Sequence, residues 1–111
     1  ATWCLPCIQE LPSIDRLQAK LGGTDFAVIA ISLDRGGKTS AMRTIKRLKL
    51  KNLSVYTDIE SKSAKALGVL YMPTTFVFDR EGRKLGALKG KAEWDDENAI
   101  ALIKYFIQST R

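Results

Sequence analysis

The chain has two cysteines, Cys4 and Cys7, and they lie in the run Trp3-Cys4-Leu5-Pro6-Cys7. The apolar residues that follow recur at helical spacing, which places Cys4 at the beginning of a helix. Residues three apart share one face of a helix, so two thiols at this spacing can open and close as a disulfide. The pattern therefore predicts a redox-active pair.

Their places in the helix predict different roles for the two sulfur atoms. Unpaired amide groups at a helix N-terminus stabilise a thiolate, so the pKa of Cys4 is expected to fall. We expect Cys4 to be the exposed nucleophile, because a thiolate attacks a disulfide and a thiol does not. Cys7 lies one turn deeper, where it is placed to attack the mixed disulfide and release the partner. Pro6 fits the first turn, where its missing N–H costs little.

Other uses of two cysteines agree less well with the sequence. A zinc site usually needs four Cys or His ligands, and this chain has two cysteines and no histidine. The same absence excludes a Cys–His nucleophilic pair. A purely structural disulfide usually closes a longer loop, because a short loop constrains the unfolded chain little. Two further alternatives stay open: a copper-handling protein that holds a cuprous ion through both thiolates, and a redox-inert binding module.

The composition indicates one globular domain, since the chain has 111 residues of which 45% are hydrophobic. Lys and Arg total 18 against 12 Asp and Glu. No run of five or six like charges appears, so we expect no nucleic-acid partner. No apolar stretch approaches the about 18 residues of a membrane span, and no signal peptide is present. The Gly37-Lys38-Thr39 sequence lacks the glycine that a phosphate-binding loop needs five residues earlier.

The hydrophobic pattern predicts helices and strands in alternation, followed by a hairpin and a last helix. Pro12 lies inside the first helix and is expected to kink it. The strand over 26–33 is almost continuously apolar, which is typical of a buried parallel strand. We assign Trp94 to packing at the start of the last helix, and expect its buried stripe to be Ala99, Leu102, Ile103 and Phe106. The expected helices cover residues 4–21, 39–50, 60–67 and 94–108, and the expected strands cover residues 26–33, 54–57, 75–79 and 84–89. This order predicts an α/β fold, a central mixed sheet flanked by helices.

These motifs resemble the TlpA-like branch of the thioredoxin superfamily, which includes ResA- and CcmG-type proteins. The resemblance covers nearly the whole chain and implies a thioredoxin-like fold with a helix–strand insert at about residues 35–57. The dipeptide between the cysteines is Leu-Pro, not the Gly-Pro of classical thioredoxins, so the redox potential is open. The matching residues are Ala1-Thr2-Trp3-Cys4-Leu5-Pro6-Cys7, Glu10, Pro12, the run GVLYMPTTFVFD at 68–79, and Gly82.

The resemblance also implies roles for residues outside the cysteine pair. Pro73 would follow a cis peptide bond and lie in contact with the disulfide, where it would shape the substrate groove. Glu10 would exchange a proton with the buried thiol, which needs a raised carboxyl pKa. The alternative for Glu10 is an ordinary surface glutamate. The residues expected to contact substrate are Trp3, Leu5, Pro6 and Met72.

By the same resemblance we expect an enzyme, a protein disulfide reductase (thiol:disulfide oxidoreductase). It would act on exported proteins, as in cytochrome c or cytochrome oxidase maturation. Its partners would be disulfide-bonded substrates and an upstream dithiol electron donor, with no cofactor and no metal. A disulfide oxidant or isomerase is the alternative, because direction depends on the potential. We expect a periplasmic or otherwise extracytoplasmic monomer, held at a membrane through an N-terminal segment upstream of Ala1.

A last expectation concerns the sheet of this one domain, residues 1–111. In the fold that the chain resembles, the strand leading into Trp3 is central, and only Ala1 and Thr2 precede Trp3 here. Without that strand, the strands at 26–33 and 75–79 would each lose a neighbour, at about 1–3 kcal/mol for each buried unpaired backbone group. We therefore expect the native protein to have a strand upstream of Ala1. A strand donated by a second copy is the alternative.

Overall fold

The structure is a computed structural model that describes residues 1–109, and every element expected from the sequence is present with bounds that differ by a few residues. The helices are α1 (Leu5–Leu21), α2 (Gly37–Arg47), α3 (Lys62–Leu67) and α4 (Glu97–Ser109). The strands are β1 (Ile29–Ser32), β2 (Ser54–Thr57), β3 (Thr74–Phe78) and β4 (Lys84–Lys89). Within residues 1–109, none of the helices combines the length and the hydrophobicity needed to cross a membrane.

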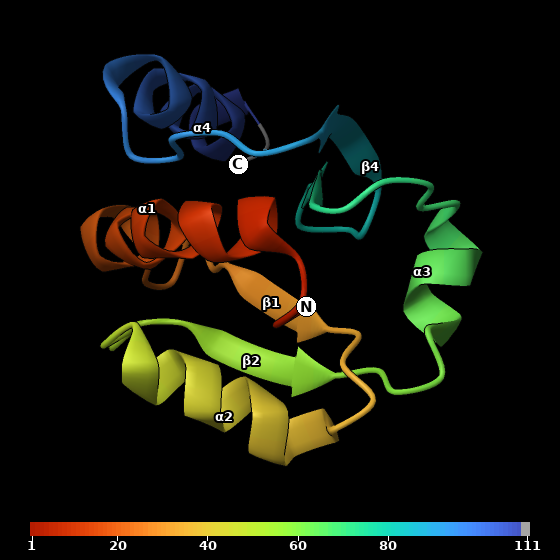
Figure 1. The fold of residues 1–111 in the computed structure, drawn as a ribbon. Helices are drawn as coiled ribbons and strands as arrows, with labels where there is room; N and C mark the ends of the chain where they lie inside the picture. Colours follow the sequence, from red (N-terminus) through yellow and green to blue (C-terminus); the bar gives the residue numbers. More distant parts are fainter. Residues whose placement is uncertain (110–111) are drawn as a thin grey trace.

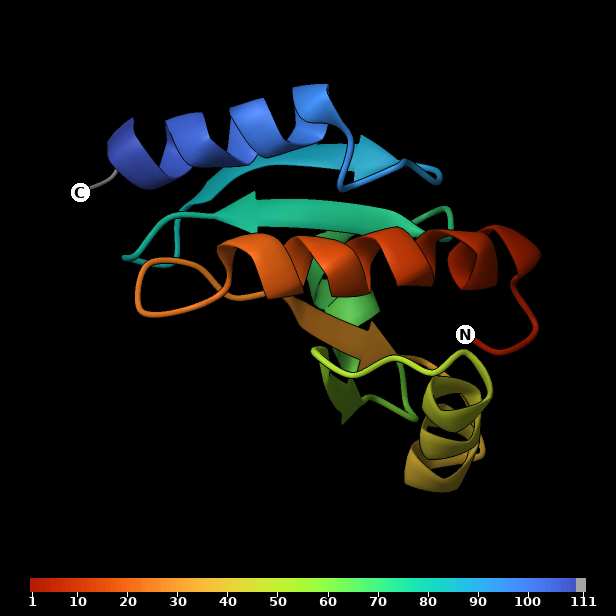
Figure 2. The same cartoon turned by 90° about the vertical axis from the view of Figure 1, so that its left-hand side faces the viewer.

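The strands form two separate pairs in the described part of the chain, rather than the single mixed sheet that the sequence predicts. β1 and β2 are parallel, with Ile29 opposite Ser54. β3 and β4 form an antiparallel hairpin, with an irregularity in register between Val77 and Phe78. In both ribbon views α1 lies between the β1–β2 pair and the layer formed by α4 and the hairpin (Figures 1 and 2). The helix that carries both cysteines thus joins the two halves.

The predicted burial of the strand over 26–33 is wrong in this structure. β1 is shorter than expected, and the side chains of Ile29 and Ile31 are 62% and 46% exposed. β2 is the only strand bonded to β1 among residues 1–109, so one edge of β1 has no strand beside it. Side chains on a strand that has a neighbour along one edge only make fewer cross-strand contacts than those on a central strand, so they keep more solvent contact.

The hydrophobic core lies between α1, α4 and the hairpin. The buried residues of this core are Leu17 and Ile103, each 3% exposed, and Trp94, which packs with them. Leu102, which the periodicity of α4 placed in the buried stripe, is 47% exposed, so this prediction is wrong. Ile100 and Ile107 pack against the core. The buried face of α4 therefore differs from the face expected from periodicity. The packing of α4 against α1 and the hairpin decides which of its side chains are covered.

Local interactions explain where α3 ends and how the connection between α2 and β2 is held. Gly68 follows α3 with a φ of 70°, a left-handed conformation that glycine adopts at little cost. The carboxylate of Asp15 in α1 accepts backbone N–H groups from Lys51, Asn52 and Leu53 at 2.8 to 3.3 Å. These bonds hold the connection between α2 and β2 against the helix of the cysteines.

Candidate active site

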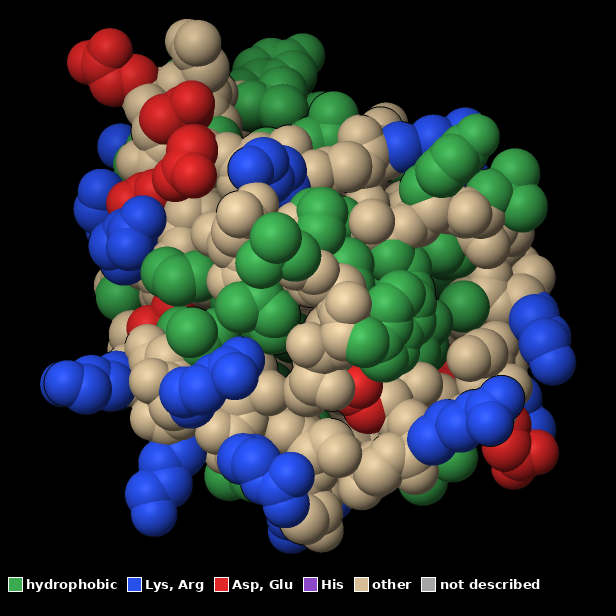
Figure 3. Space-filling model, viewed as in Figure 1, with side chains coloured by type: hydrophobic (Ala, Val, Ile, Leu, Met, Phe, Trp, Pro, Cys, Tyr) green, Lys and Arg blue, Asp and Glu red, His purple; other side chains and the backbone are tan. Residues whose placement is uncertain are grey.

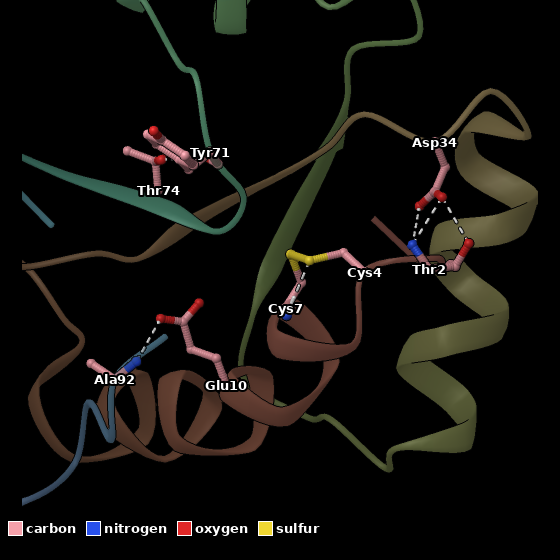
Figure 4. Close-up of a disulfide and its surroundings, with 8 residues drawn as sticks. All are labelled: Thr2, Cys4, Cys7, Glu10, Asp34, Tyr71, Thr74 and Ala92. Carbon is pink, nitrogen blue, oxygen red and sulfur yellow. Dashed lines mark hydrogen bonds between the residues drawn. A yellow bond between two sulfur atoms is a disulfide. The ribbon is translucent and has the colours of Figure 1, made fainter. Parts of the chain in front are cut away.

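Cys4 and Cys7 form a disulfide at the N-terminal end of α1 (Figure 4). Cys4 is the N-cap residue, and its Sγ accepts the backbone N–H of Cys7 at 3.3 Å. Pro6 lies in the first turn, as the sequence predicts. In the reduced protein, an N–H group directed at Sγ would stabilise the thiolate of Cys4.

The expected difference in exposure between the two cysteines is not present in the disulfide form. Cys4 is 6% exposed and Cys7 is 7% exposed, so both cysteines are buried while the bridge is closed. Their surroundings still differ, since Cys4 lines an open pocket and Cys7 does not. A partner in this pocket would therefore meet Cys4.

The pocket beside Cys4 has a volume of about 500 Å³ and is largely apolar. Trp3 and Tyr71 on its wall are 72% and 61% exposed. Met72 also lines it, so the structure brings together three of the predicted site residues, Trp3, Cys4 and Met72. On the face seen in Figure 1, apolar side chains gather in the middle, with Lys and Arg side chains along much of the edge and acidic side chains mainly at the upper left (Figure 3). Exposed apolar surface of this kind is typical of a binding site.

Leu5 and Pro6, the other two residues expected to contact substrate, lie outside the lining of this pocket. Both are exposed in the first turn of α1, and the Leu5 side chain is 65% exposed. Leu5 and Pro6 lie between the two cysteines in the chain, at the start of α1, whereas Trp3 and Met72 line the pocket. The predicted contact residues therefore surround the cysteines on two sides.

The peptide bond between Met72 and Pro73 is cis, as the resemblance implies. Pro73 is buried at the start of the hairpin, and its carbonyl accepts the N–H of Gly90 at 2.8 Å. Met72, the residue before it, faces the pocket that Cys4 lines. Contact between Pro73 and the sulfur atoms stays a prediction.

Glu10 is 4% exposed, so it is not a surface glutamate. Its Oε1 accepts the indole Nε1–H of Trp94 at 2.6 Å and the backbone N–H of Ala92 at 3.2 Å. Burial raises the pKa of Glu10 above its ordinary value, while the two hydrogen bonds act in the opposite direction. Figure 4 shows the second carboxylate oxygen pointing away from Ala92, on the side where the disulfide lies. A buried carboxyl with a raised pKa is suited to proton exchange.

Two polar contacts near the cysteines were not expected from the sequence. Asp34, 4% exposed, accepts hydrogen bonds from the backbone N–H and the hydroxyl of Thr2. Trp94 packs in the core as predicted, but its indole N–H also reaches Glu10. The sequence could have indicated a role for Asp34, because this residue directly follows the predicted strand over 26–33. The sequence pattern that assigns Trp94 to packing does not indicate which group its N–H binds.

No group of three or more His, Cys, Asp or Glu side chains in residues 1–109 is arranged to hold a metal ion. The copper alternative would therefore use two thiolates from the described part of the chain. Two soft sulfur ligands are the minimum for a cuprous ion.

The Redoxin family model matches residues 1–101. The thiol-disulfide oxidoreductase ResA of Bacillus thuringiensis subsp. konkukian (strain 97-27) is 30% identical over 90 residues, which cover 81% of this chain and 51% of ResA. The thioredoxin-like protein YneN of Bacillus subtilis (strain 168) is 32% identical over 87 residues, covering 74% of this chain and 48% of YneN. The chain thus spans about half the length of the curated relatives it matches.

Solved structures agree with this comparison. The thiol:disulfide interchange protein DsbE of Chlorobium tepidum superposes with a TM-score of 0.83 at 30% identity, over 96% of this chain and 74% of that one. StoA of Bacillus subtilis superposes with a TM-score of 0.74 at 19% identity, over 95% and 75% of the two chains. The expected thioredoxin-like fold is confirmed. With its cis-proline hairpin, its cysteine helix and a family match over residues 1–101, the chain belongs to the Redoxin family.

Proposed function

We propose that this protein is a thiol–disulfide oxidoreductase that reduces disulfides of other proteins through Cys4 and Cys7. The observation that carries the proposal is a disulfide at the N-cap of α1 that borders an open apolar pocket. The names of ResA and DsbE, which are similar to this chain at 30% identity, describe the same chemistry. A structural bridge would have no need of a pocket beside one sulfur atom.

The proposed reaction transfers two electrons to the substrate. The thiolate of Cys4 attacks a substrate disulfide, forms a mixed disulfide, and expels one substrate sulfur as a thiolate. Cys7, deprotonated, then attacks Sγ of Cys4, and the second substrate sulfur leaves. The cysteine pair ends as the disulfide seen in the structure. Another dithiol protein must reduce this bridge before the next cycle, and no organic cofactor takes part.

Glu10 would accept the proton of Cys7 in the second step. It lies one turn after Cys7 on α1, is buried, and has a raised pKa, which are the properties of a proton acceptor beside a buried thiol. Pro73 would shape the groove in which an extended substrate segment lies, with Met72 beside it. The substrate segment would contact Trp3, Leu5, Pro6 and Met72.

For the setting of the reaction, we propose exported proteins as substrates and a location outside the cytoplasm. Support comes from the resemblance to the TlpA-like branch, and the assignment to cytochrome maturation depends on that resemblance alone. Fractionation of source cells with an antibody against residues 1–111 tests the location. Recovery of the native protein only in the cytosolic fraction would refute it.

Reduction of insulin by dithiothreitol, with and without the protein, tests the activity. We expect the wild type to accelerate the reaction and Cys4→Ser to abolish the acceleration. Ser40→Ala, in α2 and outside the lining of the pocket beside Cys4, is a control that should act like the wild type. Full acceleration by Cys4→Ser would reject the proposal, and stoichiometric cuprous binding without acceleration would favour the copper alternative.

The direction of the reaction depends on the reduction potential of the Cys4–Cys7 pair. Equilibration with glutathione buffers measures it directly. A potential near that of thioredoxin, about −270 mV, supports a reductant. A potential near about −120 mV, typical of a strong disulfide oxidant, would favour the oxidant alternative.

A further inference from the structure

The side chain of Trp94 connects the hydrophobic core to the carboxyl group of Glu10, which lies one turn after Cys7 on α1. Its ring packs with Leu17 and Ile103, and the residue is 7% exposed. Its Nε1–H leaves this apolar cluster and donates to Oε1 of Glu10 at 2.6 Å, across 84 positions of sequence. Both partners are buried, so water does not compete with this charge-assisted hydrogen bond.

Further bonds attach the backbone of the same segment to α1. The Oγ of Ser13 accepts the backbone N–H of Trp94 at 3.0 Å and donates to the carbonyl of Glu10 at 2.8 Å. The backbone N–H of Ala92 reaches Oε1 of Glu10 at 3.2 Å. Core packing and these hydrogen bonds together fix the position of the indole ring. The fold therefore determines the direction in which its N–H points.

We propose that Trp94 is a positioning residue for Glu10: its indole N–H holds Oε1 and leaves Oε2 to exchange a proton with Cys7. This inference rests on the proposed function, because it assigns a task within the Cys7 step. Both hydrogen bonds to the Glu10 side chain end on Oε1. The other oxygen points away from Ala92 in Figure 4. An N–H donor also favours the ionised carboxylate, the form that can accept a proton.

The proton and electron balance of the step is simple. The thiol of Cys7 transfers its proton to Oε2 of Glu10, and the resulting thiolate attacks Sγ of Cys4. A Cys4–Cys7 bond forms as the bond between Cys4 and the substrate sulfur breaks. The substrate leaves as a thiolate and takes its proton from solvent, while Glu10 returns its own proton to solvent.

Other charged groups near Glu10 have partners elsewhere. On the segment that packs against α1, Lys91 donates to the side chain of Gln9 at 2.7 Å. Asp95 binds Arg16 of α1 at 2.6 Å, and Glu93 lies 4.0 Å from the same guanidinium. In residues 1–109, the hydrogen bonds to the Glu10 carboxylate come from the Trp94 indole and the Ala92 backbone, neither of which titrates. The pH response of Glu10 is therefore set by burial and by its two donors.

Reaction of the reduced protein with a small aromatic disulfide, 5,5′-dithiobis(2-nitrobenzoate), separates the two steps. The first thiolate released reports attack by Cys4, and the second reports attack by Cys7 on the mixed disulfide. For Trp94→Phe, which keeps an aromatic ring and removes the donor, we expect the pH midpoint of the second phase to rise by about one unit. The first phase should be unchanged. Glu10→Gln should remove this midpoint, and the double variant should behave like Glu10→Gln alone.

Two comparisons separate positioning from a loss of packing. Ile103→Val weakens the same core and keeps the indole donor, so it should leave the midpoint unchanged. Benzothienylalanine at position 94 replaces the N–H by sulfur at nearly the same shape, and should shift the midpoint as Trp94→Phe does. An equal shift in Ile103→Val would overturn the proposal. If Glu10→Gln removes the pH midpoint of the second phase but Trp94→Phe does not move it, only the role of Trp94 is overturned. If Glu10→Gln leaves this midpoint in place, the role of Glu10 is overturned as well.

Discussion

The carboxylate of Asp34, two residues past the end of β1, holds Thr2, which lies two residues before Cys4. It accepts the backbone N–H of Thr2 at 2.9 and 3.0 Å and the hydroxyl at 2.7 Å. Ser32 adds a fourth bond at 2.8 Å. The segment that enters the cysteine helix is thus attached to the β1–β2 half of the protein, so the position of Cys4 depends on a residue 32 positions away from Thr2.

We expect Asp34→Asn to lower the free energy of unfolding by about 1–3 kcal/mol, because an amide cannot accept all four hydrogen bonds. Urea unfolding at pH 7 measures the change. Glu60→Gln, at a side chain that is 75% exposed, is the matched control and should have almost no effect. Equal stability of Asp34→Asn and the wild type would mean that these bonds contribute nothing net.

The same variant has an expected pH dependence. Burial alone would raise the pKa of Asp34, but the hydrogen bonds from Thr2 and Ser32 outweigh it and lower the pKa below the ordinary 3.8. A lowered folded-state pKa gives stability that is complete above 3.8 and lost as pH falls through the lower value. The difference between wild type and Asp34→Asn should therefore narrow in strong acid. A constant difference down to pH 2 would contradict this assignment.

The pKa of Glu10 is shifted in the opposite direction to that of Asp34, so its effect on stability has the opposite pH dependence. Burial raises its pKa above 4.5 despite the bonds from Trp94 and Ala92, so the folded state favours the protonated carboxyl. Its contribution to stability is complete below 4.5 and is lost as pH rises through the folded-state pKa. Relative to the wild type, Glu10→Gln should therefore gain stability as pH rises from 4.5 toward neutral. Urea unfolding across this range measures the gain, and Glu93→Gln, at a side chain that is 70% exposed, should follow the wild type.

The sequence predicts helix starts and ends, which depend on residues nearby in the chain. It does not predict burial or long-range hydrogen bonds, which depend on residues far away in the chain. The helix start at Cys4 and the helix end at Gly68 follow from residues within one turn. Resemblance added the cis bond before Pro73. The exposure of Ile31 and Leu102 was missed, because burial is decided by elements elsewhere in the chain. The bond between Trp94 and Glu10 was missed for the same reason: periodicity marks a packing residue but not the target of its N–H.

The two cysteines should differ in reactivity once the disulfide is reduced. Cys4 is the N-cap, receives the N–H of Cys7, and borders the pocket, whereas Cys7 lies inside the first turn. We expect iodoacetamide at mildly acidic pH to label Cys4 first, because its thiolate is the better stabilised. Mass spectrometry after brief exposure identifies the labelled residue. Cys7→Ser should retain the fast labelling, and preferential labelling of Cys7 in the wild type would reverse the assignment of roles.

The last prediction concerns the unpaired strand edges of β1 and β3. β1 is bonded only to β2 and β3 only to β4 among residues 1–109, and α3 beside them has no buried residue. We propose that these pairs are halves of one sheet and that a strand lies between β1 and β3. Such a strand would cover Ile29 and Ile31 and pair backbone groups that otherwise cost about 1–3 kcal/mol each when buried without partners.

Hydrogen exchange on residues 1–111 and on the native gene product tests this proposal. We expect amides of β1 and β3 to exchange rapidly in residues 1–111 alone and to be protected in the native product, while the β4 amides bonded to β3 change less. Sedimentation distinguishes the source of the strand, because donation by a second copy requires a dimer. Strong protection of β1 and β3 in monomeric residues 1–111 would show that the two halves close without a further strand.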